Sequence, residues 1–213
     1  DGNGQQQLVD AIENLVKVES GTIEVKGRHI ENRDPQATID ASVSTIPSDR
    51  QRWGLVLPFT VAENMVLERH NEDEFGHGMR LDLDAMRTFA QGLIKEYDIR
   101  PVGCEDHAAA SLSGGNQQKV IIAREVSNEP DLLVAFQPTR GLDVGAIEFV
   151  HKALIRERDR GTAILLVSLE LDEVMDVSDT IAVIHDGKIV GTFEQGSVTE
   201  EQVGLLMAGG GAK

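Results

Sequence analysis

Apolar residues recur along the chain with two different spacings. Within 144–160 they fall three or four positions apart, which predicts a helix that ends before Gly161. Unbroken apolar runs at 132–136 and 163–167 flank this segment, and such runs are typical of strands buried on both faces. A strand, a helix and a second strand in this order predict a parallel sheet with a crossover helix.

The part of the chain before residue 59 carries weaker signals of both kinds. Short apolar runs at 22–25 and 43–46 predict two strands. A helix is expected after the opening glycines, because three apolar residues share one helical face: Leu8, Ile12 and Leu15. From 59 to 126 helical spacing dominates, which predicts a helical region inserted into the sheet-forming part.

Two apolar runs near the end of the chain, at 181–184 and 189–193, flank the pair Asp186-Gly187. An Asp-Gly pair between alternating runs is a strong signal for a tight turn that joins antiparallel strands. The sequence therefore predicts a hairpin at the edge of the parallel sheet.

Composition is that of an ordinary globular domain. The chain has 213 residues, of which 40% are hydrophobic and 26% charged, enough for one sizeable core. Its net charge of -16 argues against nucleic-acid binding, which rests on clustered Lys and Arg. Cys104 is the only cysteine, so an internal disulfide is excluded. No apolar run approaches the roughly 20 residues that cross a bilayer, so a membrane role would need a membrane-spanning partner.

The most informative stretch starts at Ser113, where Ser-Gly-Gly-Asn-Gln-Gln opens a helix with apolar residues on one face. Two glycines let another molecule approach the backbone closely, and the unpaired N–H groups of a first helical turn attract phosphate oxygens. Ser113 and Gly115 are therefore candidate phosphate contacts. A bare Ser-Gly-Gly is better explained as a serine N-cap in an ordinary loop. The longer pattern Leu-Ser-Gly-Gly-x-Gln is far more specific.

This pattern, at 112–118, resembles the signature motif of ATP-binding cassette (ABC) ATPases, the domains that drive ABC transporters. Four other segments follow the order of that family. The run at 132–139 resembles its Walker B strand and 140–143 its D-loop, while 47–50 is similar to its Q-loop region and 166–169 to its switch-histidine loop.

The resemblance implies one nucleotide-binding domain over 1–213, of the α/β P-loop NTPase type. Its mostly parallel sheet would be flanked by helices, with an inserted helical subdomain at about 59–128, the remaining core at 129–213 and an antiparallel edge hairpin. Residues 1–4, Asp-Gly-Asn-Gly, resemble the end of a phosphate loop. The N-terminal strands, including the one that leads into this loop, are therefore expected to be missing.

Positions that carry phosphate chemistry in this family differ here. Gln5 and Gln6 stand where the family has the lysine that faces the β- and γ-phosphates and the hydroxyl that binds Mg²⁺. Backbone N–H groups around Gly2, Asn3 and Gly4 remain as possible phosphate donors. We expect a degenerate phosphate loop.

The catalytic positions are altered as well. Phe136 and Gln137 replace the carboxylates that hold the metal and polarise the attacking water, and Leu169 replaces the switch histidine. Ser48 replaces the Q-loop glutamine and is predicted to lie at the interface with the partner cassette. Each lost interaction of this kind costs about 2 to 4 kcal/mol of transition-state stabilisation. No catalytic residue is intact, so hydrolysis by the isolated chain is not expected.

ABC ATPases work as head-to-tail pairs, with ATP between the phosphate loop of one domain and the signature of the other. The resemblance implies that this signature closes over ATP and Mg²⁺ held by a first cassette, in the same chain or a dimer partner. The isolated chain would hold no cofactor firmly and no metal. Five residues make up the predicted signature contact: Ser113, Gly114, Gly115, Asn116 and Gln117.

The segments 135–138 and 139–146 are similar to the second half of fused double-cassette ATPases that import sugars or nucleosides. The resemblance implies transmembrane permease subunits as partners, a substrate-binding protein outside the cell as an indirect one, and a place on the cytoplasmic face of the membrane. The transported substrate stays open, because it never touches this domain. A structural or regulatory dimer partner and a non-transport ABC ATPase remain alternatives.

Two residues allow two interpretations each. Asp143, in the D-loop, lies at the dimer interface, caps the following helix, or does both. Trp53, the sole tryptophan, contacts the permease or is a partly buried packing residue. The six histidines show no metal-ligand spacing.

Overall fold

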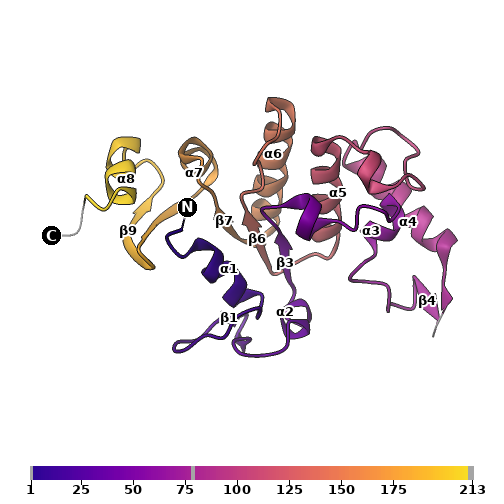
Figure 1. The fold of residues 1–213 in the computed structure, drawn as a ribbon, viewed down its shortest axis with the longest axis horizontal. Helices are drawn as coiled ribbons and strands as arrows, with labels where there is room; N and C mark the ends of the chain where they lie inside the picture. Colours follow the sequence, from indigo (N-terminus) through magenta and orange to yellow (C-terminus); the bar gives the residue numbers. More distant parts are fainter. Residues whose placement is uncertain (1, 78–79, 211–213) are drawn as a thin grey trace.

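The structure is a computed structural model that describes residues 2–77 and 80–210; Asp1, part of the predicted phosphate loop, lies outside them. Its central sheet has three parallel strands in the order β3-β6-β7 (Figure 1). They are β3 (Val43–Ile46), β6 (Leu132–Phe136) and β7 (Ala163–Val167). The predicted parallel arrangement and all three strand ranges are confirmed.

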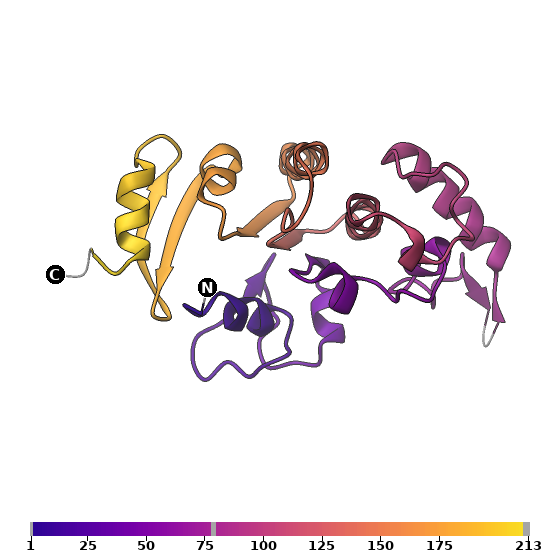
Figure 2. The same ribbon diagram turned by 45° about the horizontal axis from the view of Figure 1, so that its top comes forward.

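Helices cover both faces of this sheet. Figure 2 shows α5 (Gly114–Ser127) and α6 (Val144–Arg160) on one side and α1 (Gln5–Ile12) and α2 (Gln36–Asp40) on the other. The bounds of α6 agree with the prediction, because Gly161, with φ 100°, ends the helix in the left-handed region.

Strand β6 separates two apolar clusters, because its side chains alternate between the faces of the sheet. Leu133 and Ala135 pack with the inward faces of α5 and α6. Val134 and Phe136 pack with Val9 of α1 and its neighbours on the opposite face. The single core expected from composition is thus divided by the sheet.

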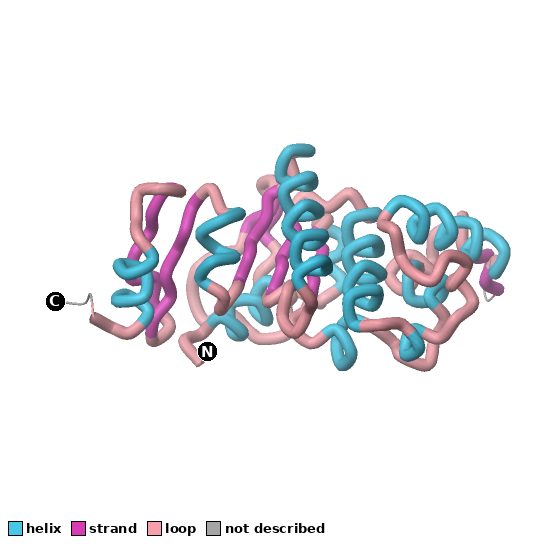
Figure 3. Tube along the Cα trace, turned by 90° about the horizontal axis from the view of Figure 1, so that it is seen from above, coloured by secondary structure: helices cyan, strands magenta, loops and turns pink. Residues whose placement is uncertain are grey.

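The helical region lies at one end of the molecule and the C-terminal hairpin at the other (Figure 3). The region contains α3 (Val61–Met65), α4 (Leu83–Glu96) and the 3-10 turn η2 (Ala109–Ser111), followed by α5. Thr60 and Glu63 cap α3 reciprocally, and Asp82 caps α4.

Two departures from the predicted pattern concern short elements. The stretch predicted as helical also holds a two-stranded sheet, β4 (Gly76–His77) with β5 (Arg80–Leu81). These strands are too short for apolar periodicity to reveal. The strand predicted at 22–25 is reduced to β1 (Glu24–Val25), which pairs with β2 (Arg28–His29).

The first helix is shorter than predicted. Helix α1 ends at Ile12, and Asn14 has a φ of 58°, a left-handed conformation that stops the helix before Leu15.

The C-terminal hairpin joins β8 (Thr180–His185) and β9 (Lys188–Glu194), as predicted, but it forms a separate two-stranded sheet. The prediction that it edges the parallel sheet is wrong for the described residues. Strands β7 and β8 are not paired among the described residues, and a cavity of about 480 Å³ lies between them, lined largely by their apolar side chains. Helix α7 (Leu171–Val177) connects them, and α8 (Glu200–Met207) packs on β8.

Within the described residues, no helix combines the length and the apolar character that crossing a membrane requires.

Candidate functional site

Three of the predicted site residues follow the carboxyl ends of neighbouring parallel strands. Ser48 comes two residues after β3, Gln137 directly after β6, and Leu169 two residues after β7. The strands are paired in register and run in one direction, so their ends meet at one edge of the sheet. Ligands of open α/β sheets bind at this edge.

The signature segment forms a capped helix start, as predicted. Ser113 is the N-cap of α5, and its Oγ accepts from the backbone N–H of Asn116 at 3.4 Å and from Asn116 Nδ2 at 2.9 Å. The N–H groups of Gly114 and Gly115 fall in the first turn, outside the intrahelical ladder. Backbone donors and a helix dipole together suit a phosphate group.

Asn116 and Gln117 also hold the helix start in place. Asn116 Oδ1 accepts from the N–H of Arg100 at 2.8 Å. Gln117 is only 2% exposed; its Nε2 donates to Ala109 O at 3.1 Å, and its Oε1 accepts from Gln51 Nε2 at 3.1 Å. Both ends of the Gln117 amide are bonded within the protein, and its role as a nucleotide contact stays a prediction.

The D-loop lies directly beside the signature. Asp143 Oδ1 accepts from Ala146 N at 2.9 Å, so the predicted N-cap of α6 is confirmed. A Cβ built on Gly115 would lie 3.2 Å from Ala146 Cβ and 3.8 Å from Asp143 Oδ2. Glycine at 115 therefore allows the starts of α5 and α6 to sit side by side. The interface role of Asp143 stays a prediction.

The phosphate-loop region differs from the signature in the hydrogen bonds that its backbone N–H groups make. Asn3 N–H donates to the side-chain Oε1 of Gln5 at 3.0 Å, so one of the expected phosphate donors is already bonded. Gly4, with φ 102°, precedes α1 without a side-chain cap. Gln6 Nε2 is exposed and donates to Asp10 Oδ1 at 2.6 Å.

The same loop is attached to the C-terminal hairpin, which sequence reasoning did not anticipate. Gly187 N–H donates to Asn3 O at 2.9 Å, and Asp186 N–H donates to Asn3 Oδ1 at 3.0 Å. The Asp-Gly turn signal was visible in the sequence, but its partner 183 residues away was not.

Three of the residues predicted to replace catalytic groups lie in or beside apolar surroundings. Phe136 is 7% exposed and lies in the apolar cluster beneath α1. Leu169 and Gln5 line the cavity beside β7. Gln137 adopts a left-handed φ of 48°, and its N–H donates to Val167 O at 2.7 Å.

These residues do not fit a resident metal ion. Among the residues the structure describes, no group of three or more His, Cys, Asp or Glu side chains is placed to hold one. The start of α5 offers backbone N–H donors that suit phosphate, whereas the side chains of Phe136 and Gln137 offer no carboxylate to Mg²⁺.

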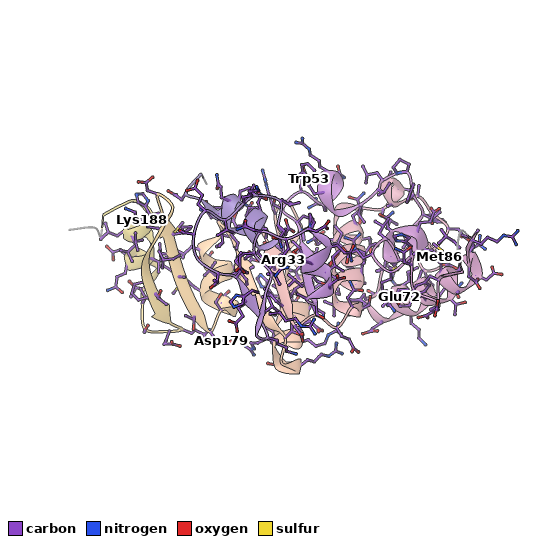
Figure 4. All side chains as sticks on the ribbon, turned by 90° about the horizontal axis from the view of Figure 1, so that it is seen from below. Arg33, Trp53, Glu72, Met86, Asp179 and Lys188 are labelled. Carbon is purple, nitrogen blue, oxygen red and sulfur yellow. The ribbon has the colours of Figure 1, made fainter. Side chains whose placement is uncertain are left out.

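Trp53 overturns one interpretation. Its side chain points away from the ribbon and is 68% exposed (Figure 4). The Arg52 guanidinium stacks 4.7 Å from the ring centroid. The expectation of a partly buried packing residue is wrong, because the short helix that carries Trp53 turns it away from the core. The permease contact remains open.

Comparison with known proteins agrees with the motifs. The family model described as ABC transporter matches residues 1–140. The chain belongs to the ABC transporter ATP-binding family. Domains of this family bind ATP with Mg²⁺, and the predicted P-loop NTPase fold with its parallel sheet and helical insertion is confirmed. It resembles two ATP-binding cassettes of known structure, one of them a dimer in a post-hydrolysis state with ADP and phosphate.

The dimeric cassette has a TM-score of 0.72 and 21% identity over 91% of this chain and 82% of its own. The other has a TM-score of 0.75 and 20% identity over 97% of this chain and 81% of its own. At these identities the likeness concerns the fold.

Curated relatives are more similar in sequence. A nucleoside import ATP-binding protein of Lactococcus lactis is 50% identical over 99% of this chain, and a guanosine import ATP-binding protein of Bacillus subtilis is 49% identical over 98%. A glucose import ATP-binding protein of Haloferax volcanii is 44% identical over 99%. The chain spans 41%, 41% and 38% of their respective lengths. It thus matches about two fifths of each.

Proposed function

We propose that this chain is the second nucleotide-binding cassette of an ABC importer ATPase for nucleosides or simple sugars. The relatives that match nearly all of it are named for nucleoside, guanosine and glucose import. They are more than twice as long as the region matched, which leaves room for another cassette in the same protein. Nucleosides rank first among the candidate transported substrates, because the two most identical of these three relatives are named for nucleoside import and guanosine import.

The signature carries the proposal. Ser113 and the first-turn N–H groups of Gly114 and Gly115 present donors at a helix start, next to the D-loop residue Asp143. We propose that they close over ATP and Mg²⁺ held by the first cassette. The chain then contributes to hydrolysis without catalytic residues of its own, because donors that act on the γ-phosphate need only be correctly placed.

The chain's own phosphate loop is proposed to be degenerate. The Gln5 side chain accepts a hydrogen bond from the Asn3 N–H and carries no positive charge for a phosphate group. Phe136 places an aromatic ring where Mg²⁺ needs a carboxylate. Removing the metal ligand and the water-polarising group together leaves little catalysis at this site. A nucleotide held there would not be turned over.

A permease is the proposed membrane partner. Trp53 and Arg52 stand out from the short helix after Ser48, and an exposed, stacked Trp-Arg pair is a typical protein contact. We propose that the chain lies on the cytoplasmic face of the membrane. A substrate-binding protein outside the cell would act through the permease and make no contact here.

The domain is proposed to be completed by a strand between β7 and β8. Their facing edges are unpaired among the described residues, and the cavity between them is lined by apolar side chains, including Leu165, Val167 and Val183. A strand inserted there would join both sheets and lead toward the loop at Gly4. Slower hydrogen exchange of the β7 amides in the longer protein than in this chain would support it.

Ser113→Arg in the complete double-cassette protein tests the proposed function. An arginine at the N-cap removes the hydroxyl and fills the space that the γ-phosphate needs, so ATP turnover should fall at least about a hundredfold. Ser197→Arg, at an exposed serine of a C-terminal loop, controls for the added charge. Wild-type turnover in Ser113→Arg would overturn donation by the signature and favour a structural dimer partner.

A further inference from the structure

A short π-helix, η1 (Arg50–Gly54), lies against the signature helix. Asp49 caps it by accepting from the N–H groups of Gln51 and Arg52, both at 3.1 Å. A Cβ built on Gly54 would come within 2.5 Å of Ile121 Cδ1, so a larger residue here would have to displace the Ile121 side chain of α5. Single π-helical turns are rare and occur frequently at functional sites.

Two hydrogen bonds fasten η1 along α5. Gln51 Nε2 donates to Gln117 Oε1 at 3.1 Å near the start of α5, and Arg124 Nη1 donates to Gly54 O at 3.0 Å about two turns later. Displacement of η1 would therefore move the signature helix with it.

Arg50 extends this attachment to the signature turn itself. A Cβ built on Gly114 would lie 2.9 Å from Arg50 Nη2, and one on Gly141 3.9 Å from the same atom. Arg50 Nη1 donates to Arg140 O at 2.9 Å. The guanidinium thus occupies the space between the signature glycines and the loop that leads to Asp143.

We infer that Arg50 is a positioning residue that fixes the spacing between the signature turn and the D-loop. The inference rests on the proposed function, because that spacing matters only if the signature acts on ATP. Arginine suits this role, since its planar fork can bond one segment while packing flat on another, which a lysine ammonium cannot do.

Electrostatics separates this role from simple packing. The start of a helix carries a partial positive charge, so a guanidinium beside Gly114 is unfavourable unless an anion is also near. Arg50 Nε is buried and bonds no protein atom among the described residues. An unpaired guanidinium N–H beside the signature turn suits a segment that meets a phosphate group.

Arg50→Ala in the complete double-cassette protein tests the inference. ATP is held mainly by the other cassette, so kcat should fall about tenfold while the KM for ATP stays within about twofold. Arg50→Lys keeps a donor for Arg140 O and should recover part of kcat. Arg28→Ala is the matched control: Arg28 Nη1 also donates to a backbone carbonyl, Asp40 O at 3.2 Å, outside the signature region.

Hydrogen exchange shows whether the loss arises from positioning. The Gln117 N–H donates to Ser113 O at 2.8 Å, and the Leu142 N–H donates to Thr139 O at 3.1 Å. Both should exchange faster in Arg50→Ala and remain unchanged in Arg28→Ala. If Arg50→Ala lowers the yield of folded protein, hydrogen exchange in Arg50→Lys is compared with that in Arg28→Ala instead.

The two hypotheses fail differently. Turnover in Arg50→Ala equal to that of Arg28→Ala, while Ser113→Arg abolishes turnover, would overturn the role of Arg50 and leave the proposed function standing. Wild-type turnover in Ser113→Arg would overturn the proposed function itself.

Discussion

The starts of α5 and α1 have similar sequences and different chemistry. Each helix follows a glycine-containing turn, and each turn was predicted to meet phosphate. At α5, Ser113 caps the helix and the N–H groups of Gly114 and Gly115 stay outside the helical ladder. At α1, the Gln5 side chain accepts from Asn3 N–H. Each turn thus has one N–H bonded by a nearby side chain, but the N–H groups of Gly114 and Gly115 at α5 still lack an intrahelical partner.

The surroundings of the two helix starts are polar at α5 and apolar at α1. The α5 start adjoins the capped start of α6 at Asp143, where polar groups gather. The α1 start adjoins Phe136, Leu169 and the apolar cavity beside β7. Around α1, Phe136 and Leu169 contribute to apolar packing, so under the proposed function we expect the two regions to respond to mutation in opposite ways.

The largest effect on stability is expected from restoring a carboxylate beneath α1. Phe136→Asp removes a buried ring and buries a charge in an apolar cluster, so the free energy of unfolding should fall by about 3 to 5 kcal/mol in urea titrations. Gln137→Glu, at a half-buried neighbour outside that cluster, should change it by less than about 1 kcal/mol. Equal stability of Phe136→Asp and wild type would contradict the view that this region has become a packing region.

A smaller effect separates the two roles of Asp143. Asp143→Ala removes the N-cap of α6 and should cost about 1 kcal/mol of stability, whereas Asp143→Asn keeps a cap of similar strength. If Asp143 also communicates across the dimer, Asp143→Asn will restore the thermal midpoint but not ATP turnover in the double-cassette protein. Full recovery of both would limit Asp143 to capping.

Strong local patterns predicted much of the fold. The strands at 132–136 and 163–167 and the helix at 144–160 were predicted with their observed bounds, because unbroken apolar runs and a terminal Gly161 are local signals. Short elements such as η1 were not predicted. The conformation of η1 depends on its close packing against α5, which the spacing of apolar residues does not reveal.

The site was predictable at the level of residue types. Family motifs predicted the signature and the altered positions, including Gln5. They could not show that Gln5 bonds Asn3, that Arg50 lies against Gly114, or that Trp53 is exposed, because each depends on side-chain placement between distant segments.

The smallest effect concerns the far end of α5, which anchors the signature helix. Loss of hydration, followed by the nearby Glu125 carboxylate, raises the pKa of Glu68 to about 7. Glu125 is 1% exposed and bonds Arg124 at 2.7 Å. The folded protein therefore binds the Glu68 proton more tightly than the unfolded chain does. The associated stability is fully present below about pH 4.5 and is lost as the pH rises through about 7.

Glu68→Gln should therefore raise the thermal midpoint at pH 8 and leave it unchanged near pH 4.5. Glu68 is exposed as a whole residue, so solvent screening should limit the gain to about 2 °C. Glu148→Gln is the control. Lys152 lowers the pKa of Glu148, so the small change that Glu148→Gln makes in the thermal midpoint should be constant from pH 5 to pH 8. A pH-independent difference in Glu68→Gln would show that Glu68 does not titrate against Glu125. The anchoring of α5 would then be insensitive to pH, and its two ends could be treated as independent.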